Sequence, residues 1–187
     1  MVNNKDNMRK VDIYDSTLRD GAQAENIGFS LEDKLLIAQK FDDIGIQYIE
    51  GGYPNPTNPK DIEFFRHVRS LGLKTSAVTA FGSTRRAKNR PEDDPGLRAL
   101  LDADTAIVTI FGKSWDLHAT EVLKISLDQN LEIIEDSVRF LASEGRRVFF
   151  DAEHFFDGYR TNHDYALRTL AAAEAGGAEI VVLCDTN

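Results

Sequence analysis

The first strand and helix are predicted by residues 11–45, which read VDIYDSTLRDGAQAENIGFSLEDKLLIAQKFDDIG. The largely apolar run at residues 11–14 is typical of a strand that is covered on both faces. A helical pattern follows at Leu31–Ile44, where Ser30 is suited to cap the first turn and Gly45 to end the helix. The segment therefore predicts one strand–loop–helix unit of a parallel sheet.

The same alternation continues to the end of the chain. Strands are expected at Val11–Thr17, Gln47–Tyr53, Lys74–Ala80, Thr105–Phe111, Arg147–Phe156 and Ala178–Thr186. Helices are expected at Leu31–Ile44, Pro59–Leu71, Pro95–Leu101, Thr120–Ser143 and His163–Ala175. Repeated units of this kind predict an α/β fold with right-handed crossovers, either a doubly wound sheet or a (β/α)8 barrel.

The composition excludes several functional classes. The 187 residues include 22 Lys and Arg against 31 Asp and Glu, which gives a formal net charge of −9. Because this charge repels phosphate backbones and anionic lipids, we expect neither nucleic acid nor a membrane as a partner. The one cysteine, Cys184, excludes an internal disulfide, and no apolar run approaches the roughly 20 residues of a membrane span. These features favour a cytoplasmic protein.

The length raises a question about domain organisation. Residues 1–10 are polar and are expected to form a flexible N-terminal segment, followed by one folded unit at residues 11–187. A closed barrel takes about 250 residues and eight strands, whereas this pattern gives six strands, the last of them near Asn187. We therefore expect residues 11–187 to be the N-terminal part of a barrel, with about six strands and five helices, and to have little activity alone.

Charged and polar side chains collect where the predicted strands end. In parallel α/β folds these ends face a common cavity, so residues there carry more functional weight than others. The candidates at these ends are Asp15, Arg19, Asp20, Glu50, Asp151, Glu153, Asp185 and Thr186. Converging carboxylates bind a cation or have raised pKa values that suit proton transfer. The alternative is that each acid caps a helix or lies on a solvated rim.

Asp151 and Glu153 are two residues apart on one predicted strand, so their side chains share a face. If that face points inward, repulsion between the two carboxylates raises the pKa of the pair and makes one of them a usable proton carrier. A salt bridge from one of them to Arg147 or Arg160 at the rim is the competing interpretation.

The segment Asp15–Gln23, followed by Lys34, resembles the N-terminal signature of the 2-isopropylmalate, homocitrate and citramalate synthase family, which is related to 3-hydroxy-3-methylglutaryl-CoA lyase. Supporting matches follow in order at Ile49–Pro54, Asp151–Glu153 and Leu183–Asn187. The likeness covers about residues 11–187. It implies a (β/α)8 TIM barrel that binds a divalent metal and condenses the enolate of acetyl-CoA with a 2-oxo acid.

Within this family, the run Asp151–Gly158 is most similar to the citramalate synthase branch. That likeness implies pyruvate as the oxo acid, a product used in branched-chain amino-acid synthesis, and a homodimer. The metal implied is Mg²⁺, Mn²⁺ or Zn²⁺, and acetyl-CoA is the cosubstrate. Three alternatives stay open: a 2-isopropylmalate synthase, a carbon–carbon lyase of the same fold, and a non-catalytic α/β module that binds a small ligand.

The resemblance also implies roles for individual residues. Asp20 is a metal ligand, Arg19 steadies the developing oxyanion, and Glu153 takes or relays the proton from the acetyl methyl group. Glu50 lies behind the site and orients Arg19.

Three further residues are implied to bind substrate. Thr186 binds the carboxylate of the oxo acid, and Gln23 and Asp151 line the same site. The family completes its metal site with a His-x-His pair, and the four histidines of this sequence include no such pair. Metal affinity of the chain by itself is therefore expected to be weak.

Overall fold

The computed structural model describes residues 10–55 and 57–186. Except for Lys10, the segment expected to be flexible lies outside the described residues. Six strands form one parallel sheet in the order in which they occur along the chain. They are β1 (Tyr14–Asp15), β2 (Tyr48–Gly52), β3 (Ala77–Ser83), β4 (Ile107–Lys113), β5 (Arg147–Glu153) and β6 (Ile180–Leu183).

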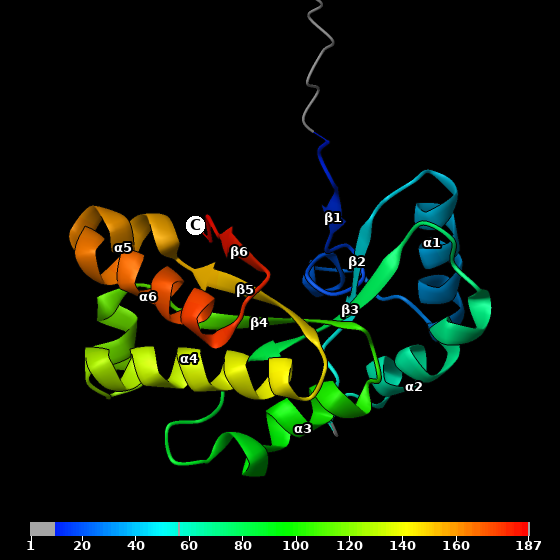
Figure 1. Cartoon of the computed structure of the whole chain (residues 1–187). Helices are drawn as coiled ribbons and strands as arrows, with labels where there is room; N and C mark the ends of the chain where they lie inside the picture. Colours follow the sequence, from blue (N-terminus) through cyan, green and yellow to red (C-terminus); the bar gives the residue numbers. More distant parts are fainter. Residues whose placement is uncertain (1–9, 56, 187) are drawn as a thin grey trace, which may run out of the picture.

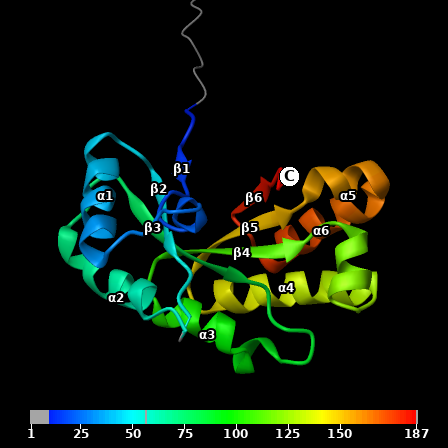
Figure 2. The ribbon, with the colours of Figure 1, turned by 180° about the vertical axis from the view of Figure 1, so that it is seen from behind.

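The sheet curls into part of a barrel, and the helices lie on its outer side (Figures 1 and 2). They are α1 (Leu31–Asp43), α2 (Pro59–Val68), α3 (Pro95–Asp102), α4 (Leu127–Ser143), α5 (Phe155–Thr161) and α6 (His163–Gly176). None of them has the length and hydropathy that a membrane-spanning helix requires, as far as the described part of the chain goes.

Strand β5 shows how the core is divided between the two faces of the sheet. Val148, Phe150 and Ala152 belong to the buried core between sheet and helices. Phe149 points the other way, into the curl, where its ring lies 5.2 Å from Tyr48. Because side chains alternate along a strand, Asp151 and Glu153 share the inner face with Phe149.

Strand β5 ends earlier than the sequence predicts, and a helix that the sequence does not predict follows it. The strand expected to reach Phe156 stops at Glu153, and α5 begins at Phe155. Between them His154 adopts a left-handed conformation with φ of 53°. The aromatic run around this break is typical of a buried strand, so the sequence predicts no helix here. The described residues therefore contain six helices where the sequence predicts five.

Two other boundaries also differ from expectation. The helix expected at Thr120–Ser143 is interrupted: a π-helical turn occupies His118–Val122, and α4 starts at Leu127. Ser126 caps this later start through its hydroxyl, which accepts a hydrogen bond from the Gln129 N–H at 3.1 Å. The first strand forms ladder pairs only at Tyr14–Asp15, rather than over residues 11–17.

A buried ion pair between Lys34 of α1 and Asp61 of α2 joins the first two units of the fold. Asp61 also accepts hydrogen bonds from the Tyr53 N–H and from Asn58 Nδ2, each at 2.8 Å. Gly52 makes room for this carboxylate, since a Cβ there would lie 2.5 Å from Asp61. The pair thereby fixes the loop that follows β2.

Candidate functional site

A cavity of about 380 Å³ lies at the carboxyl ends of the strands. Six of the seven residues assigned to the site from sequence line it, namely Arg19, Asp20, Gln23, Asp151, Glu153 and Thr186. The remaining lining residues are Tyr53, Phe81, Phe111, Cys184 and Asp185. The topology brings these side chains together because every strand is parallel and presents its carboxyl end to the same edge.

Arg19 is the cation that lines this cavity. Its Nε donates to Glu50 Oε1 at 2.5 Å, and its Nη1 donates to Asp20 Oδ1 at 2.9 Å. The guanidinium carbon lies 3.8 Å from the centre of the Phe81 ring. Within the described residues, none accepts a hydrogen bond from Nη2. The guanidinium is therefore held through Nε and Nη1, and its Nη2 is free to donate.

Glu50 lies behind Arg19, as the sequence resemblance implies, and its side chain is 1% exposed. The Tyr14 hydroxyl donates to its second carboxylate oxygen at 2.5 Å. That hydroxyl is also 2.9 Å from Thr109 Oγ1, which is in turn 2.9 Å from Thr79 Oγ1. Burial raises the pKa of Glu50, although the charge of Arg19 opposes this. The network explains how a buried carboxylate can hold the guanidinium in place.

Asp151 faces the cavity, and its pKa is raised to about 7. Burial is the main cause, and repulsion from Glu50 adds to it, while Arg19 acts in the opposite direction. The expectation that Glu153 raises the pKa of Asp151 is thus wrong, because the carboxylate that repels Asp151 is Glu50 of β2. A carboxyl with this pKa exchanges a proton readily near neutral pH.

Glu153 forms an ion pair with Lys113. The two residues face each other directly in the register of β4 and β5. In the described part of the chain neither Arg147 nor Arg160 pairs with these carboxylates, since Arg147 pairs with Glu179 and Glu153 with Lys113. Lys113 was not among the predicted residues. Its position at the end of the neighbouring strand is the signal that could have identified it.

Thr186 and Gln23 lie at the rim of the cavity. The Thr186 hydroxyl oxygen accepts a hydrogen bond from the His154 N–H at 3.0 Å. Among residues 10–55 and 57–186 no acceptor takes the hydroxyl proton, so it can be donated to a ligand. Gln23 ends a short 3₁₀ helix at Gly21–Gln23, which follows Asp20 directly, and its side chain is exposed.

A small aromatic cluster beside Glu153 was also missed from sequence. The His118 and His154 rings are 4.7 Å apart, and Trp115 lies 4.9 Å from His118. His154 Nδ1 is 3.0 Å from Asp157 Oδ2. Burial, and then the neighbouring His154, lowers the pKa of His118. Neither histidine lines the cavity, so this geometry gives His118 no place in the candidate active site.

The donor set for a metal is incomplete within the described residues. Asp20 offers a carboxylate at the cavity, and carboxylate oxygens suit Mg²⁺ or Mn²⁺. However, no group of three or more His, Cys, Asp or Glu side chains in residues 10–55 and 57–186 is arranged to hold an ion. Asp20 is therefore at most one ligand of a larger set.

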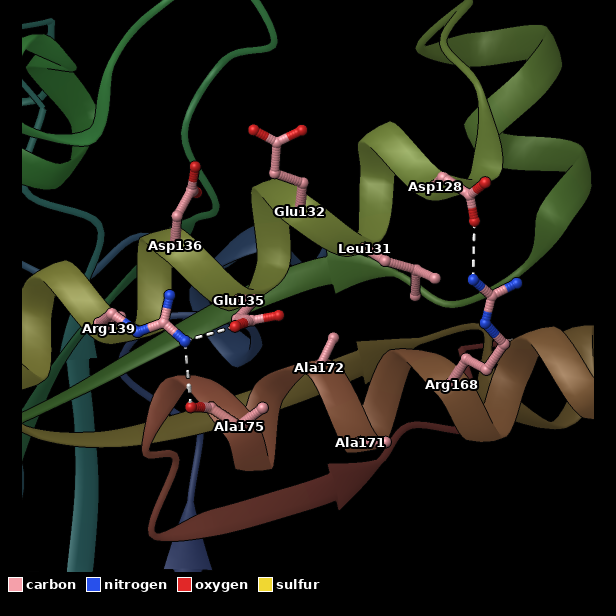
Figure 3. A pocket seen from close by; sticks show the side chains of 10 residues that line it. All are labelled: Asp128, Leu131, Glu132, Glu135, Asp136, Arg139, Arg168, Ala171, Ala172 and Ala175. Carbon is pink, nitrogen blue, oxygen red and sulfur yellow. Dashed lines mark hydrogen bonds and ion pairs between the residues drawn. The ribbon is translucent and has the colours of Figure 1, made fainter.

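A second, larger cavity of about 670 Å³ lies on the outer side, between α4 and α6 (Figure 3). Its cations already have partners: Arg139 pairs with Glu135, and Arg168 pairs with Asp128 at 2.7 Å. It is also separated from the strand ends by the sheet. The smaller cavity around Arg19 is therefore the candidate active site.

A sequence profile of the HMGL-like family matches residues 10–187. The chain belongs to the HMGL-like family. This HMGL-like chain is 54% identical to an (R)-citramalate synthase of Geobacter sulfurreducens over 96% of its own length. It is 30% identical to a 2-isopropylmalate synthase of Shouchella clausii, again over 96%. The chain spans about a third of the length of these relatives.

Solved structures agree on the fold of the HMGL-like chain. The hydroxymethylglutaryl-CoA lyase of Pseudomonas aeruginosa superimposes with a TM-score of 0.72 at 19% identity. The match covers 94% of this chain and 58% of the lyase chain. The α/β fold of the TIM-barrel type predicted from sequence is thereby confirmed, and the doubly wound alternative is wrong.

Proposed function

We propose that this chain forms the N-terminal part of the catalytic barrel of a citramalate synthase, in which acetyl-CoA condenses with pyruvate. The observation that carries the proposal is the difference in identity, 54% to a citramalate synthase against 30% to a 2-isopropylmalate synthase. The cavity supports it, because it combines a fixed guanidinium with the carboxyl of Asp151, which can exchange a proton near neutral pH.

The chain's own residues suit the binding and activation of an oxo acid. The free edge of Arg19 stabilises the negative charge that develops on the carbonyl oxygen as the carbon–carbon bond forms. Arginine suits this role because it stays charged and presents a rigid array of donors. Thr186 donates its hydroxyl proton to the substrate carboxylate, and Gln23 contacts the substrate from the rim.

Two carboxylates serve the proton transfers in this proposal. Glu153, held by Lys113, takes the proton from the acetyl methyl group, and Asp151 contacts the substrate with a carboxyl that titrates near neutral pH. Glu50 acts on the reaction by positioning Arg19. A divalent metal (Mg²⁺, Mn²⁺ or Zn²⁺) is part of the proposal: it would polarise the carbonyl of the oxo acid, with Asp20 as one of its ligands.

The setting of the reaction is proposed on the same basis. The partners are the two small-molecule substrates and, for the whole enzyme, a second copy in a homodimer. The enzyme is proposed to act in the cytoplasm, in the synthesis of branched-chain amino acids. Since the chain spans about a third of its relatives, we expect little turnover from the 187 residues alone.

A chimera tests the proposal. Residues 10–187 replace the matching segment of the Geobacter sulfurreducens enzyme, and thiol release from acetyl-CoA is followed with Mn²⁺ and a panel of 2-oxo acids. Thiol release with pyruvate is the expected result. Preference for 2-oxoisovalerate would redirect the proposal to 2-isopropylmalate synthesis. A folded chimera, verified by circular dichroism, that releases no thiol with any oxo acid would contradict it.

A further inference from the structure

His154 links strand β5 to helix α5, and its backbone is left-handed, with φ of 53° and ψ of 37°. Residues with a side chain rarely adopt this conformation, because their Cβ crowds the following carbonyl oxygen. They persist where the surrounding structure holds them, and they are frequent at active sites. His154 directly follows Glu153, the base of the proposed reaction, but its ring does not line the cavity. Any contribution to the reaction therefore passes through its neighbours.

The left-handed turn directs two successive N–H groups toward the segment that follows β6. The His154 N–H donates to Thr186 Oγ1 at 3.0 Å. The Phe155 N–H donates to the Cys184 carbonyl at 3.2 Å. The end of β5 and the segment after β6 are therefore joined through the backbone of this turn.

The residue before the turn is joined to the other neighbouring strand. The Glu153 carbonyl accepts a hydrogen bond from the N–H of Ser114, which follows β4, at 3.2 Å. Helix α5 packs at the same point, since a Cβ on Gly158 would overlap the Ser114 carbonyl oxygen. The turn at His154 thus lies where the ends of β4, β5 and β6 are held together.

The side chain of His154 is enclosed by contacts that hold this turn. Its Nδ1 is 3.0 Å from Asp157 Oδ2, in the first turn of α5. Its ring lies 4.7 Å from the His118 ring, edge to face, and 5.8 Å from the Trp115 ring. The side chain is only 17% exposed. The ring is therefore held between α5 and the segment after β4, and these contacts offset the cost of the left-handed backbone.

The turn connects two groups that act on different substrates in the proposed reaction. Glu153 takes the proton from the acetyl methyl group, and Thr186 binds the carboxylate of the oxo acid. Both line the cavity, and His154 is bonded covalently to the first and by a hydrogen bond to the second. Because a displacement of about 1 Å at a reacting group slows a reaction strongly, a relaxed turn would disturb both groups at once.

We infer that His154 is a positioning residue whose left-handed backbone, held by the contacts of its ring, sets the placement of Glu153 relative to Thr186. The inference rests on the proposed function, which gives these two residues their roles. Loss of the turn should therefore lower kcat and raise KM for pyruvate together. Loss of the Glu153 carboxylate alone should act chiefly on kcat, and loss of the Thr186 hydroxyl alone chiefly on KM.

The test compares three variants of the chimera. His154→Ala removes the ring and disfavours the left-handed backbone, whereas His154→Asn keeps a residue that tolerates it. Lys124→Ala is the matched control, because Lys124 is also left-handed, with φ of 57°, and is exposed in the turn before α4. We expect His154→Ala to lower kcat at least about tenfold and to raise KM for pyruvate. His154→Asn should recover most of this loss, and Lys124→Ala should match the unsubstituted chimera.

Amide hydrogen exchange in the 187-residue chain tests the turn without turnover. The N–H groups of residues 154 and 155 should exchange slowly in the wild type and in His154→Asn. In His154→Ala they should exchange at least about tenfold faster, because a strained turn that has lost its ring contacts opens more easily. Unchanged exchange in His154→Ala would overturn the inference.

Turnover can overturn it in two further ways. These are equal kcat in His154→Ala and Lys124→Ala, and a loss in His154→Asn as large as in His154→Ala. Failure of the proposed function is separate. If exchange accelerates in His154→Ala while the unsubstituted, folded chimera releases no thiol, the turn holds the strand ends as inferred and the condensation falls. If the chimera is active and His154→Ala equals it, the condensation stands and the inference falls.

Discussion

Two ion pairs of this fold have cations from the same N-terminal signature but different surroundings. Lys34 and Asp61 are buried between α1 and α2, and Asp61 accepts two further hydrogen bonds from Tyr53 and Asn58. Arg19 and Glu50 lie at the cavity, where Glu50 is buried and Arg19 keeps one edge free. In the first pair the carboxylate accepts three hydrogen bonds from the protein, whereas in the second the guanidinium keeps one edge toward the cavity. The signature therefore contains one cation buried between helices and one that lines the cavity.

The largest effect is expected at the structural pair. Lys34→Met leaves the Asp61 charge buried without its cation, and the free energy of unfolding should fall by about 3–5 kcal/mol. Urea unfolding of the chain measures this. Lys40→Met, which removes a cation from an exposed pair with Asp43, serves as the control and should cost less than about 1 kcal/mol. An equal loss of free energy of unfolding in the two variants would contradict the structural role assigned to the buried pair.

A smaller effect is expected when the positioning of Arg19 is weakened. Glu50→Gln keeps the shape of the side chain but removes the charge that holds the guanidinium. We expect kcat of the chimera to fall about tenfold to a hundredfold, because a modest misplacement of a reacting group carries a cost of this order. KM for pyruvate should change less. Glu179→Gln, at an exposed pair with Arg147, is the control. An unchanged kcat in Glu50→Gln would refute the positioning role.

The pH dependence of stability tests the electrostatics of the cavity. Because the pKa of Asp151 is raised from 3.8 to about 7, the folded protein binds this proton more tightly than the unfolded chain does. This group's contribution to stability is therefore complete below about pH 4 and is lost as the pH rises through 7. Between pH 5 and pH 8 the free energy of unfolding of the wild type should therefore fall by about 1–3 kcal/mol relative to that of Asp151→Asn, which has no carboxyl to titrate. Urea unfolding at both pH values measures it, and a constant difference would contradict the assigned cause.

Much of this architecture could be predicted from the sequence because it depends on local patterns. The six strands were recognised from short apolar runs, and their parallel order brings Arg19, Asp151, Glu153 and Thr186 to one edge. The identity of interaction partners was harder to predict. Glu153 pairs with Lys113 and not with Arg147 or Arg160, because strand register decides which side chains meet.

The predicted helix boundaries are wrong where the backbone conformation overrides the preference of the residues. The left-handed His154 turns an aromatic strand pattern into helix α5, and no glycine marks that position. The break before α4 did have a signal. Ser126 and Gln129 have the spacing of a helix cap, and the cap is present in the structure. The raised pKa of Asp151 was expected from the wrong neighbour, because Glu50 is distant in sequence and adjacent only in the folded sheet.

The most direct test of the central claim is the turnover of the chimera with Arg19→Lys. Lysine keeps the positive charge but lacks the planar array of donors that contacts Glu50 and Asp20 and that, in the proposed reaction, faces the developing oxyanion. We predict that kcat for thiol release with pyruvate falls by about 10²–10³, with a much smaller change in KM. A kcat that stays within the error of the unsubstituted chimera, in a variant that is folded and stable, would contradict the claim.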